Sequence, residues 1–317
     1  YPSEEIEKAT KDLLLVEFHD ILPGSAIEPV GEYAQAVAGH GLTELRPEKI
    51  KAFLALCSDK AKAEEGTIPV FVYNPHPYEV DETVEVEFQL PDQNKNPALY
   101  SVPHVYYMGK EIPCQREHEI SNFNVDWRIK TVFFAKLPAG TMSRFDIKME
   151  LRENPVPPVQ PEGDELVWNN GKMKVVINLH TGLIDSYEAD GRVGLGKGSF
   201  APLAIKDDEN SWAHKEKSFR NIKGEFTLMD EEKAAEFSGI INGSRPHSVR
   251  IIEDGAVRTV VEALFSYHDS FLARRYYLPK NSSDFTVRDK VYWNEKMTML
   301  KLSLRTVDGD IFIGQTA

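Results

Sequence analysis

The sequence has few cysteines, fewer basic than acidic residues, and no long apolar run. Its two cysteines, Cys57 and Cys114, lie in segments of different pattern and lack C-x-x-C spacing, so neither a disulfide framework nor a thiolate metal site is indicated. The 37 Lys and Arg against 50 Asp and Glu give a net charge of −13. Because nucleic acids and anionic membranes are themselves polyanions, that charge disfavours both as partners.

Two further absences bear on location and on completeness. No apolar run approaches the roughly 20 residues that span a bilayer, and the acidic start lacks the basic region of a signal peptide. The sequence therefore predicts a soluble protein and leaves the compartment open, with the cytoplasm slightly favoured. The 317 residues are enough for two or three domains of roughly 100–150 residues. Because the chain enters a helix without a Met and stops shortly after Asp310, we expect a fragment.

Helical periodicity dominates the first 65 residues. Apolar residues recur at helical spacing over residues 4–18. Ser25 fits the N-cap of a second helix, which Gly39-His40-Gly41 ends, and Pro47 is well placed to open a third. Three helices with short connections predict a three-helix bundle over residues 1–65.

From Ile68 the apolar period changes to two. Regular alternation, turn signals and length predict a small antiparallel β-sandwich over residues 66–153. Residues 154–163 hold four prolines and are interpreted as a stiff linker. A second alternating pattern predicts a larger β-sandwich over residues 164–317, truncated at its C-terminus. The predicted fold class is α+β with several domains.

The segment most typical of a functional site is Phe18-His-Asp-Ile-Leu-Pro-Gly-Ser25, where a helix gives way to a loop. His19 could bind zinc through an imidazole nitrogen, and Asp20 could accept hydrogen bonds from sugar hydroxyls. A second interpretation is structural, with His19 at the negative end of the helix dipole and Asp20 in an Asx-turn. The residue types alone favour this second interpretation, since zinc needs three or four ligands.

The same segment resembles the signature at the join of the catalytic and helical domains in glycoside hydrolase family 38, the retaining, zinc-dependent α-mannosidases. The resemblance continues in order through three strand motifs: Val70-Phe-Val-Tyr-Asn-Pro, Gly109-Lys-Glu-Ile-Pro-Cys-Gln and Val291-Tyr-Trp-Asn-Glu-Lys. It is weak over residues 190–255. The loop motif is specific, and the strand motifs support it.

The resemblance implies a fold and a partial site. It implies a galactose-mutarotase-like supersandwich at the C-terminus, His19 as the fourth zinc ligand and Asp20 as a contact to the mannose hydroxyls. The family's nucleophile, its general acid and the other three zinc ligands belong to an N-terminal barrel that this sequence lacks. We therefore expect no catalytic carboxylate pair in this chain. The chain alone is expected to bind zinc weakly or not at all and to leave mannosides intact.

A noncatalytic carbohydrate-binding or interaction module is the alternative. Under either hypothesis the partner is a mannoside or another saccharide, and under the first it also includes the missing barrel. The mannosidic linkage and the oligomeric state stay open.

Overall fold

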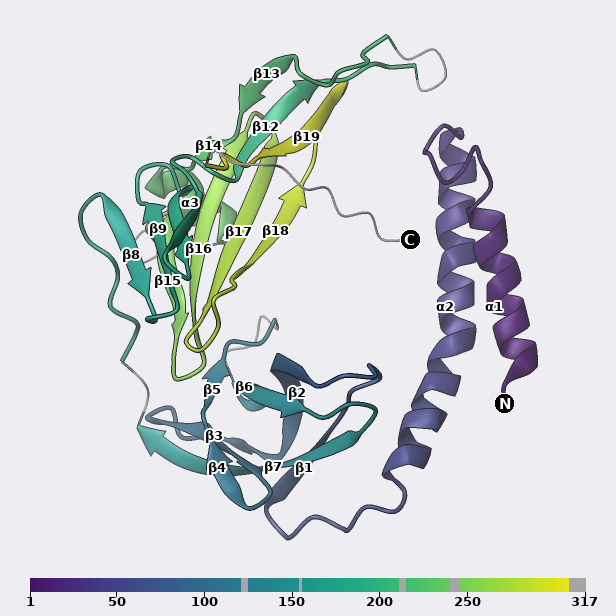
Figure 1. Ribbon diagram of the computed structural model, residues 1–317, viewed down its shortest axis with the longest axis vertical. Coiled ribbons are helices and arrows are strands. Elements are labelled where there is room, and N and C mark those ends of the chain that lie inside the picture. Colours follow the sequence, from purple (N-terminus) through teal and green to yellow (C-terminus); the bar gives the residue numbers. More distant parts are fainter. Residues whose placement is uncertain (121–124, 154–155, 211–214, 240–245, 308–317) are drawn as a thin grey trace.

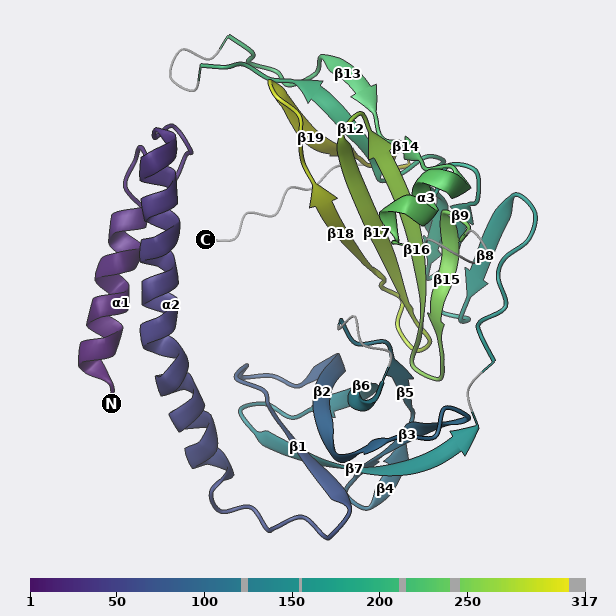
Figure 2. The ribbon, with the colours of Figure 1, turned by 180° about the vertical axis from the view of Figure 1, so that it is seen from behind.

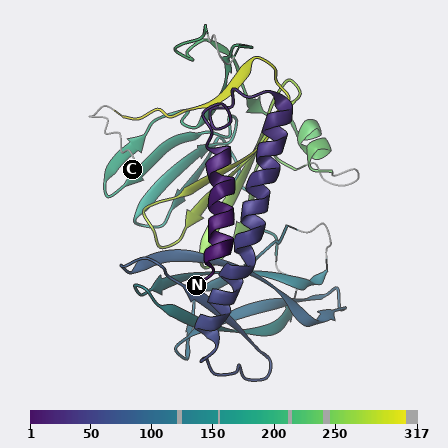
Figure 3. The same cartoon turned by 90° about the vertical axis from the view of Figure 1, so that its right-hand side faces the viewer.

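The protein was analysed as a computed structural model, which describes residues 1–120, 125–153, 156–210, 215–239 and 246–307. Figure 1 shows an α+β fold in three parts: a helical hairpin, a small β unit and a large β unit. Figure 2 shows the same arrangement from behind, and Figure 3 shows the hairpin in front of both β units. The last ten residues, 308–317, lie outside the described residues.

The first part is a hairpin of two helices. Helix α1 spans Ser3–Val16 and helix α2 spans Glu28–Cys57. The predicted first helix is confirmed within two residues at its C-terminal end. The predicted three-helix bundle is wrong, because the expected second and third helices are one continuous helix.

Helix packing explains why α2 continues through its glycines. Gly41 is buried, and a Cβ added there would lie 3.4 Å from the Asp12 Cβ and 3.6 Å from the Ala9 Cα. The glycine therefore permits close approach of α1 and does not end the helix. Pro47 also lies inside α2 and does not open a new helix. Ile27, with no side-chain cap, precedes the helix, while the Ser25 hydroxyl donates to the Asp20 carbonyl, 3.3 Å away.

The small β unit contains two antiparallel sheets that share one core. One sheet has the order β1-β7-β3-β4 and the other β2-β6-β5. Phe133 and Phe145, one from each sheet, are buried against each other with ring centroids 4.7 Å apart. The strands are β1 (Thr67–Tyr73), β2 (Val80–Asn94), β3 (Leu99–Tyr107), β4 (Lys110–Ile112), β5 (Cys114–Glu117), β6 (Asp126–Leu137) and β7 (Met142–Glu153).

The large β unit has three antiparallel sheets around the largest core, with helix α3 (Glu231–Phe237) on one of them. The sheet orders are β11-β10-β9-β8, β13-β12-β19 and β14-β16-β17-β18, with β15 beside β16. The strands are β8 (Glu165–Asn169), β9 (Met173–Asn178), β10 (Ile184–Ala189), β11 (Arg192–Leu195), β12 (Ala201–Lys206), β13 (Ile222–Glu225), β14 (Thr227–Leu228), β15 (Val249–Asp254), β16 (Arg258–Tyr267), β17 (Ser270–Pro279), β18 (Thr286–Tyr292) and β19 (Thr298–Ser303).

Alternation in the sequence accounts for these strands. The side chains of β7 from Met142 to Ile147 alternate between partly exposed and buried, as expected for one face on the core. In β16 nearly every residue is buried, because sheet, core and α3 cover both faces. The described part of the stretch from residue 207 to 244 contains β13, β14 and α3.

The two β units meet at a polar junction. The Gln115 side-chain oxygen of β5 accepts hydrogen bonds from the backbone N–H groups of Val257 and Arg258, both at 2.9 Å. The Arg258 guanidinium donates to both carboxylate oxygens of Glu117 at 2.6 Å. These buried, directional bonds fix the small β unit against the end of β16.

The described helices include none with the length and apolar character needed to cross a bilayer.

Candidate functional site

The candidate site is the loop between α1 and α2, which forms the tip of the hairpin. Figure 1 shows this tip at the end of the hairpin that points away from the small β unit. Helix α1 ends at its C-cap Glu17, and the chain then turns tightly, with the N–H groups of Ile21 and Leu22 both bonded to the Phe18 carbonyl. The loop is therefore held by its own backbone.

The two predicted site residues lie side by side at this tip. The His19 Nε2 atom is 3.6 Å from the Asp20 Oδ1 atom, and the His19 ring contacts the Phe18 ring at a centroid distance of 4.2 Å. The His19 side chain is 78% exposed and that of Asp20 is 32% exposed. The imidazole and the carboxylate are thus both present at the tip of the hairpin.

The residues present do not make a complete metal site. Zinc in proteins takes three or four protein ligands. Within the described ranges, no group of three or more His, Cys, Asp or Glu side chains is placed to hold a metal ion. His19 and Asp20 can therefore contribute to a zinc site only together with donors from elsewhere.

A second histidine on the hairpin was not predicted as functional. The His40 Nδ1 atom of α2 lies 2.7 Å from the Asp12 Oδ2 atom of α1, and its Nε2 atom lies 3.9 Å from Glu44. The hydrogen bond to Asp12 raises the pKa of His40 above its usual 6.5. This contact joins the two helices, which gives His40 a structural role. No local sequence pattern predicts this contact, because His40 and Asp12 are 28 positions apart.

In the large β unit, a serine, a carboxylate and a histidine lie close together. The Glu295 carboxylate accepts a hydrogen bond from the Ser270 hydroxyl at 2.9 Å and lies 3.3 Å from the His268 Nδ1 atom. A nucleophilic serine needs its base within hydrogen-bond reach, whereas here the carboxylate stands between the two groups. The buried Ser270 also accepts from the Asn294 N–H at 2.8 Å, so the cluster orders the turn between β16 and β17.

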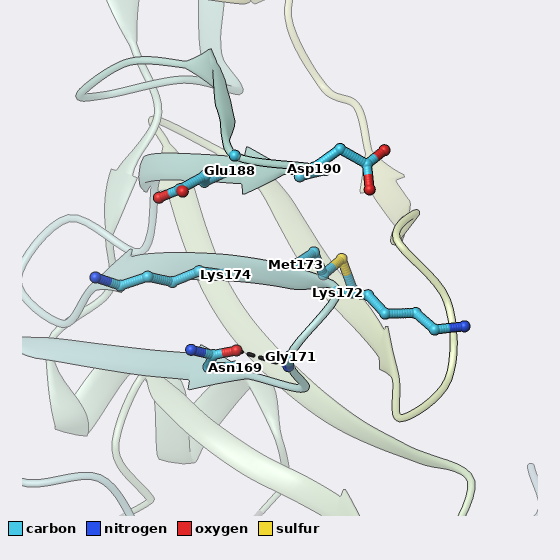
Figure 4. A pocket seen from close by; sticks show the side chains of 9 residues that line it. Asn169, Gly171, Lys172, Met173, Lys174, Glu188 and Asp190 are labelled. Carbon is cyan, nitrogen blue, oxygen red and sulfur yellow. Dashed lines mark hydrogen bonds between the residues drawn. The ribbon is translucent and has the colours of Figure 1, made fainter.

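A shallow pocket of about 350 Å³ lies at the hairpin ends of β8 to β11. Figure 4 shows two lysines, Lys172 and Lys174, and two carboxylates, Glu188 and Asp190, among its lining residues. The charges are balanced, and Figure 1 places this sheet across the molecule from the helical hairpin. The pocket is therefore separate from the His19 loop.

Comparison with solved structures identifies the fold. The chain is similar to an alpha-mannosidase from Enterococcus faecalis V583, with a TM-score of 0.56 and 12% sequence identity over 95% of this chain. It is also similar to a protein in the glycosyl hydrolase family 38 from Enterococcus faecalis, with a TM-score of 0.60 and 11% identity over 96% of this chain. This is a fold found in glycoside hydrolase family 38 structures.

The likeness is confined to part of those proteins. The chain spans 38% of the first structure and 41% of the second. No protein-family model matches the sequence, and a search of curated proteins finds no match. At these identities the comparison describes the fold, while zinc, substrate and site residues stay predictions.

Proposed function

We propose that this chain is part of a glycoside hydrolase that acts on terminal α-mannosides by a zinc-assisted, retaining mechanism. His19 supplies one nitrogen ligand to the zinc ion, and Asp20 contacts the sugar hydroxyls. The nucleophile, the general acid and the other zinc ligands come from protein outside this sequence. The chain alone is proposed to be inactive.

One observation carries the proposal. The loop motif that resembles family 38 lies at an exposed hairpin tip, in a chain whose fold is similar to two proteins described as an alpha-mannosidase and a family 38 protein. Sequence motif and fold are independent lines of support, because the fold match has only 11–12% identity. An exposed His-Asp pair on a fixed loop also suits a site that a second part of the protein completes.

The exposed surface of helix α2 favours contact with another segment of protein. The C-terminal half of α2 leaves large apolar side chains exposed, among them Ile50 at 59% and Leu54 at 61%. Apolar surface of this kind marks contact sites, since helices normally bury their apolar face. We propose that protein chain preceding Tyr1, including the predicted barrel, covers this surface and brings the remaining ligands to His19.

The division into domains belongs to the same proposal. It comprises a helical part over residues 1–65, a small β-sandwich over 66–153, a linker over 154–163 and a larger sandwich over 164–317. The galactose-mutarotase-like architecture of the last domain is part of it. Support comes from the shared core of the two sheets in the small β unit and from the separate, larger core of the large β unit. Residues 154 and 155 of the linker lie outside the described residues.

The test uses the protein encoded by the complete gene. We expect about one zinc ion per chain by elemental analysis and turnover of an aryl α-mannoside. His19→Ala is expected to lower both zinc content and turnover at least tenfold, since loss of a ligand weakens metal binding. The matched control is His40→Ala, which removes the other hairpin histidine, partnered by Asp12.

The outcomes separate the hypotheses. Loss of zinc and activity in His19→Ala alone would support the proposal. Equal activity in the wild type and His19→Ala would contradict the role of His19. Binding of mannosides without zinc or turnover would favour the noncatalytic carbohydrate-binding module.

A further inference from the structure

A chain of ion pairs crosses the outer face of the β15 to β18 sheet and continues into the small β unit. The strand register places Arg250, Glu262, Arg275 and Arg288 directly opposite one another on four successive strands. These four side chains therefore share one face of the sheet, on strands about 4.8 Å apart. Figure 2 shows this face toward the viewer, with α3 beside it.

The first half of the chain of contacts centres on Glu262. Its two carboxylate oxygens accept from Arg250 Nη2 at 2.7 Å and from Arg275 Nε at 3.0 Å. The Glu262 side chain is only 8% exposed, and each of its two oxygens accepts a hydrogen bond from one of these arginines. No further carboxylate is present in this cross-strand row.

The second half centres on Glu85 of the small β unit. Its carboxylate lies 2.9 Å from Arg258, 3.0 Å from Lys130 and 3.3 Å from Arg288. Glu117 takes a second contact from Lys130, at 3.1 Å, besides its bonds to Arg258. Arg288 and Arg258 also lie over the Tyr277 ring, each 4.6 Å from its centroid.

The positive charges outnumber the negative ones. Among the described residues, these ion pairs join five cations to three carboxylates, so the surplus is 5 − 3 = +2. The whole chain has a net charge of −13, which makes a local positive surplus unusual. Like charges directly opposite on neighbouring strands also cost stability, and Arg275 and Arg288 form such a pair.

The surplus is accessible at one place. Arg275 is 46% exposed and Arg288 is 58% exposed, whereas Arg258 and Glu117 at the other end are buried. In the same row, the Arg250 Nη1 atom is buried without a hydrogen-bond partner in the described part of the chain. Lys290, next on the same face of β18 and exposed, adds another cation.

We propose that Arg275 and Arg288 form a binding site for an oxyanion of the phosphate or carboxylate class. Paired guanidinium groups suit this chemistry because each offers several N–H donors in a planar fork. The buried pair of Arg258 and Glu117 holds the two β units together, while the exposed arginines take the ligand. The site lies on the large β unit and does not depend on the role assigned to His19.

The test measures phosphate binding to the purified chain at low ionic strength by phosphorus NMR line width. Inorganic phosphate and mannose 6-phosphate are the two probes, and mannose is added as an uncharged competitor. We expect both phosphates to bind, and we expect excess mannose to leave the line width of bound phosphate unchanged. Tighter binding of mannose 6-phosphate identifies a sugar-borne anion, and equal binding identifies the free oxyanion.

The variants decide whether the arginines form the site. Arg275→Gln with Arg288→Gln is expected to weaken phosphate binding at least about tenfold, as two charge-assisted hydrogen bonds are lost. Lys172→Gln with Lys174→Gln removes the same charge at the balanced pocket of Figure 4 and is expected to leave binding unchanged. Arg275→Lys with Arg288→Lys keeps the charge and guards against misfolding, and it is expected to weaken binding partly.

Two results would overturn the proposal. One is wild-type protein that binds neither phosphate. The other is equal weakening in the arginine and lysine double variants, which would show non-specific attraction.

Discussion

At the scale of single residues, Gly182 illustrates how one backbone position supports the large core. It has a φ of +69°, and a Cβ there would lie 2.8 Å from the Phe265 Cζ and 2.9 Å from the Leu228 Cδ1. Its carbonyl also accepts a hydrogen bond from the buried Tyr276 hydroxyl at 2.8 Å. No local sequence pattern encodes this contact, because the ring of Phe265 comes from a strand some 80 residues later.

We expect Gly182→Ala to lower the free energy of unfolding by about 2–4 kcal/mol, since backbone strain and overpacking add. Urea unfolding followed by circular dichroism measures the loss. The control is Gly140→Ala, where φ is +61° but nothing lies within 4 Å of the added Cβ. It should cost about 1 kcal/mol from backbone strain alone. Equal losses at both positions would argue against the packing explanation.

The residue scale also shows what could be predicted of the site. The position of His19 and Asp20 next to each other at a helix end could be predicted, because the two residues are adjacent in the sequence and Pro23-Gly24 follows them. The contacts of His40 and the ion pairs of Arg258 involve partners 28 and more than 100 residues away. No local pattern encodes such distances, so these groups emerged only from the fold.

At the scale of elements, the strands and the first helix followed their sequence patterns, and helix α2 did not. The burial of the strands follows the apolar pattern of the sequence, since one face of β7 is buried from Met142 to Ile147 and nearly every residue of β16 is buried. The glycines on either side of His40 predicted a helix end and Pro47 predicted a helix start, yet α2 continues through all of these positions. A glycine signal can mean a turn or a close helix contact, and the choice depends on the neighbour, here Ala9 of α1.

The exposed end of α2 provides an element-scale prediction through its last residue, Cys57. In the 317-residue chain we expect a maleimide to label Cys57 faster than Cys114, because burial raises the pKa of the Cys114 thiol. The Cys114 thiol also donates to the Pro103 carbonyl at 3.2 Å. In the protein encoded by the complete gene, the covering segment should slow labelling of Cys57 at least about tenfold.

Mass spectrometry of the labelled peptides assigns each rate, and Cys57→Ser confirms which phase belongs to Cys57. Cys114 serves as the internal control, since its rate should be the same in both proteins. Unchanged labelling of Cys57 in the longer protein would mean that the end of α2 stays open. This result would contradict the proposal that a preceding segment covers α2. It would not contradict the role of His19, which the zinc content tests separately.

At the scale of the whole molecule, the relative placement of the β units depends on charged groups at their junction. Arg258 and Arg288 come from the large β unit, and Glu85 and Glu117 come from the small one. Breaking a buried ion pair is costly because the remaining charge loses its partner. The junction should therefore respond to pH through its carboxylates.

Glu85 makes the stability of this junction depend on pH. Burial alone would raise its pKa, but hydrogen bonds from Arg258 and Lys130 outweigh it and lower the pKa from 4.5 to about 2. A carboxylate with a lowered pKa in the folded state stabilises the protein above its unfolded pKa and loses that contribution as the pH falls. The contribution is therefore complete above about pH 5 and disappears as the pH falls from about 4.5 to about 2.

Comparing the wild type with Glu85→Gln by urea unfolding from pH 7 to pH 2 isolates this term. We expect the variant to be less stable by a constant amount down to about pH 5, and the difference to shrink steadily below it. Below that pH the wild type takes up a proton at Glu85 when it unfolds, and the variant does not. A difference that stays constant down to pH 2 would show that Glu85 does not link the two β units through its charge. A shrinking difference would tie the acid stability of the whole molecule to one carboxylate shared by both.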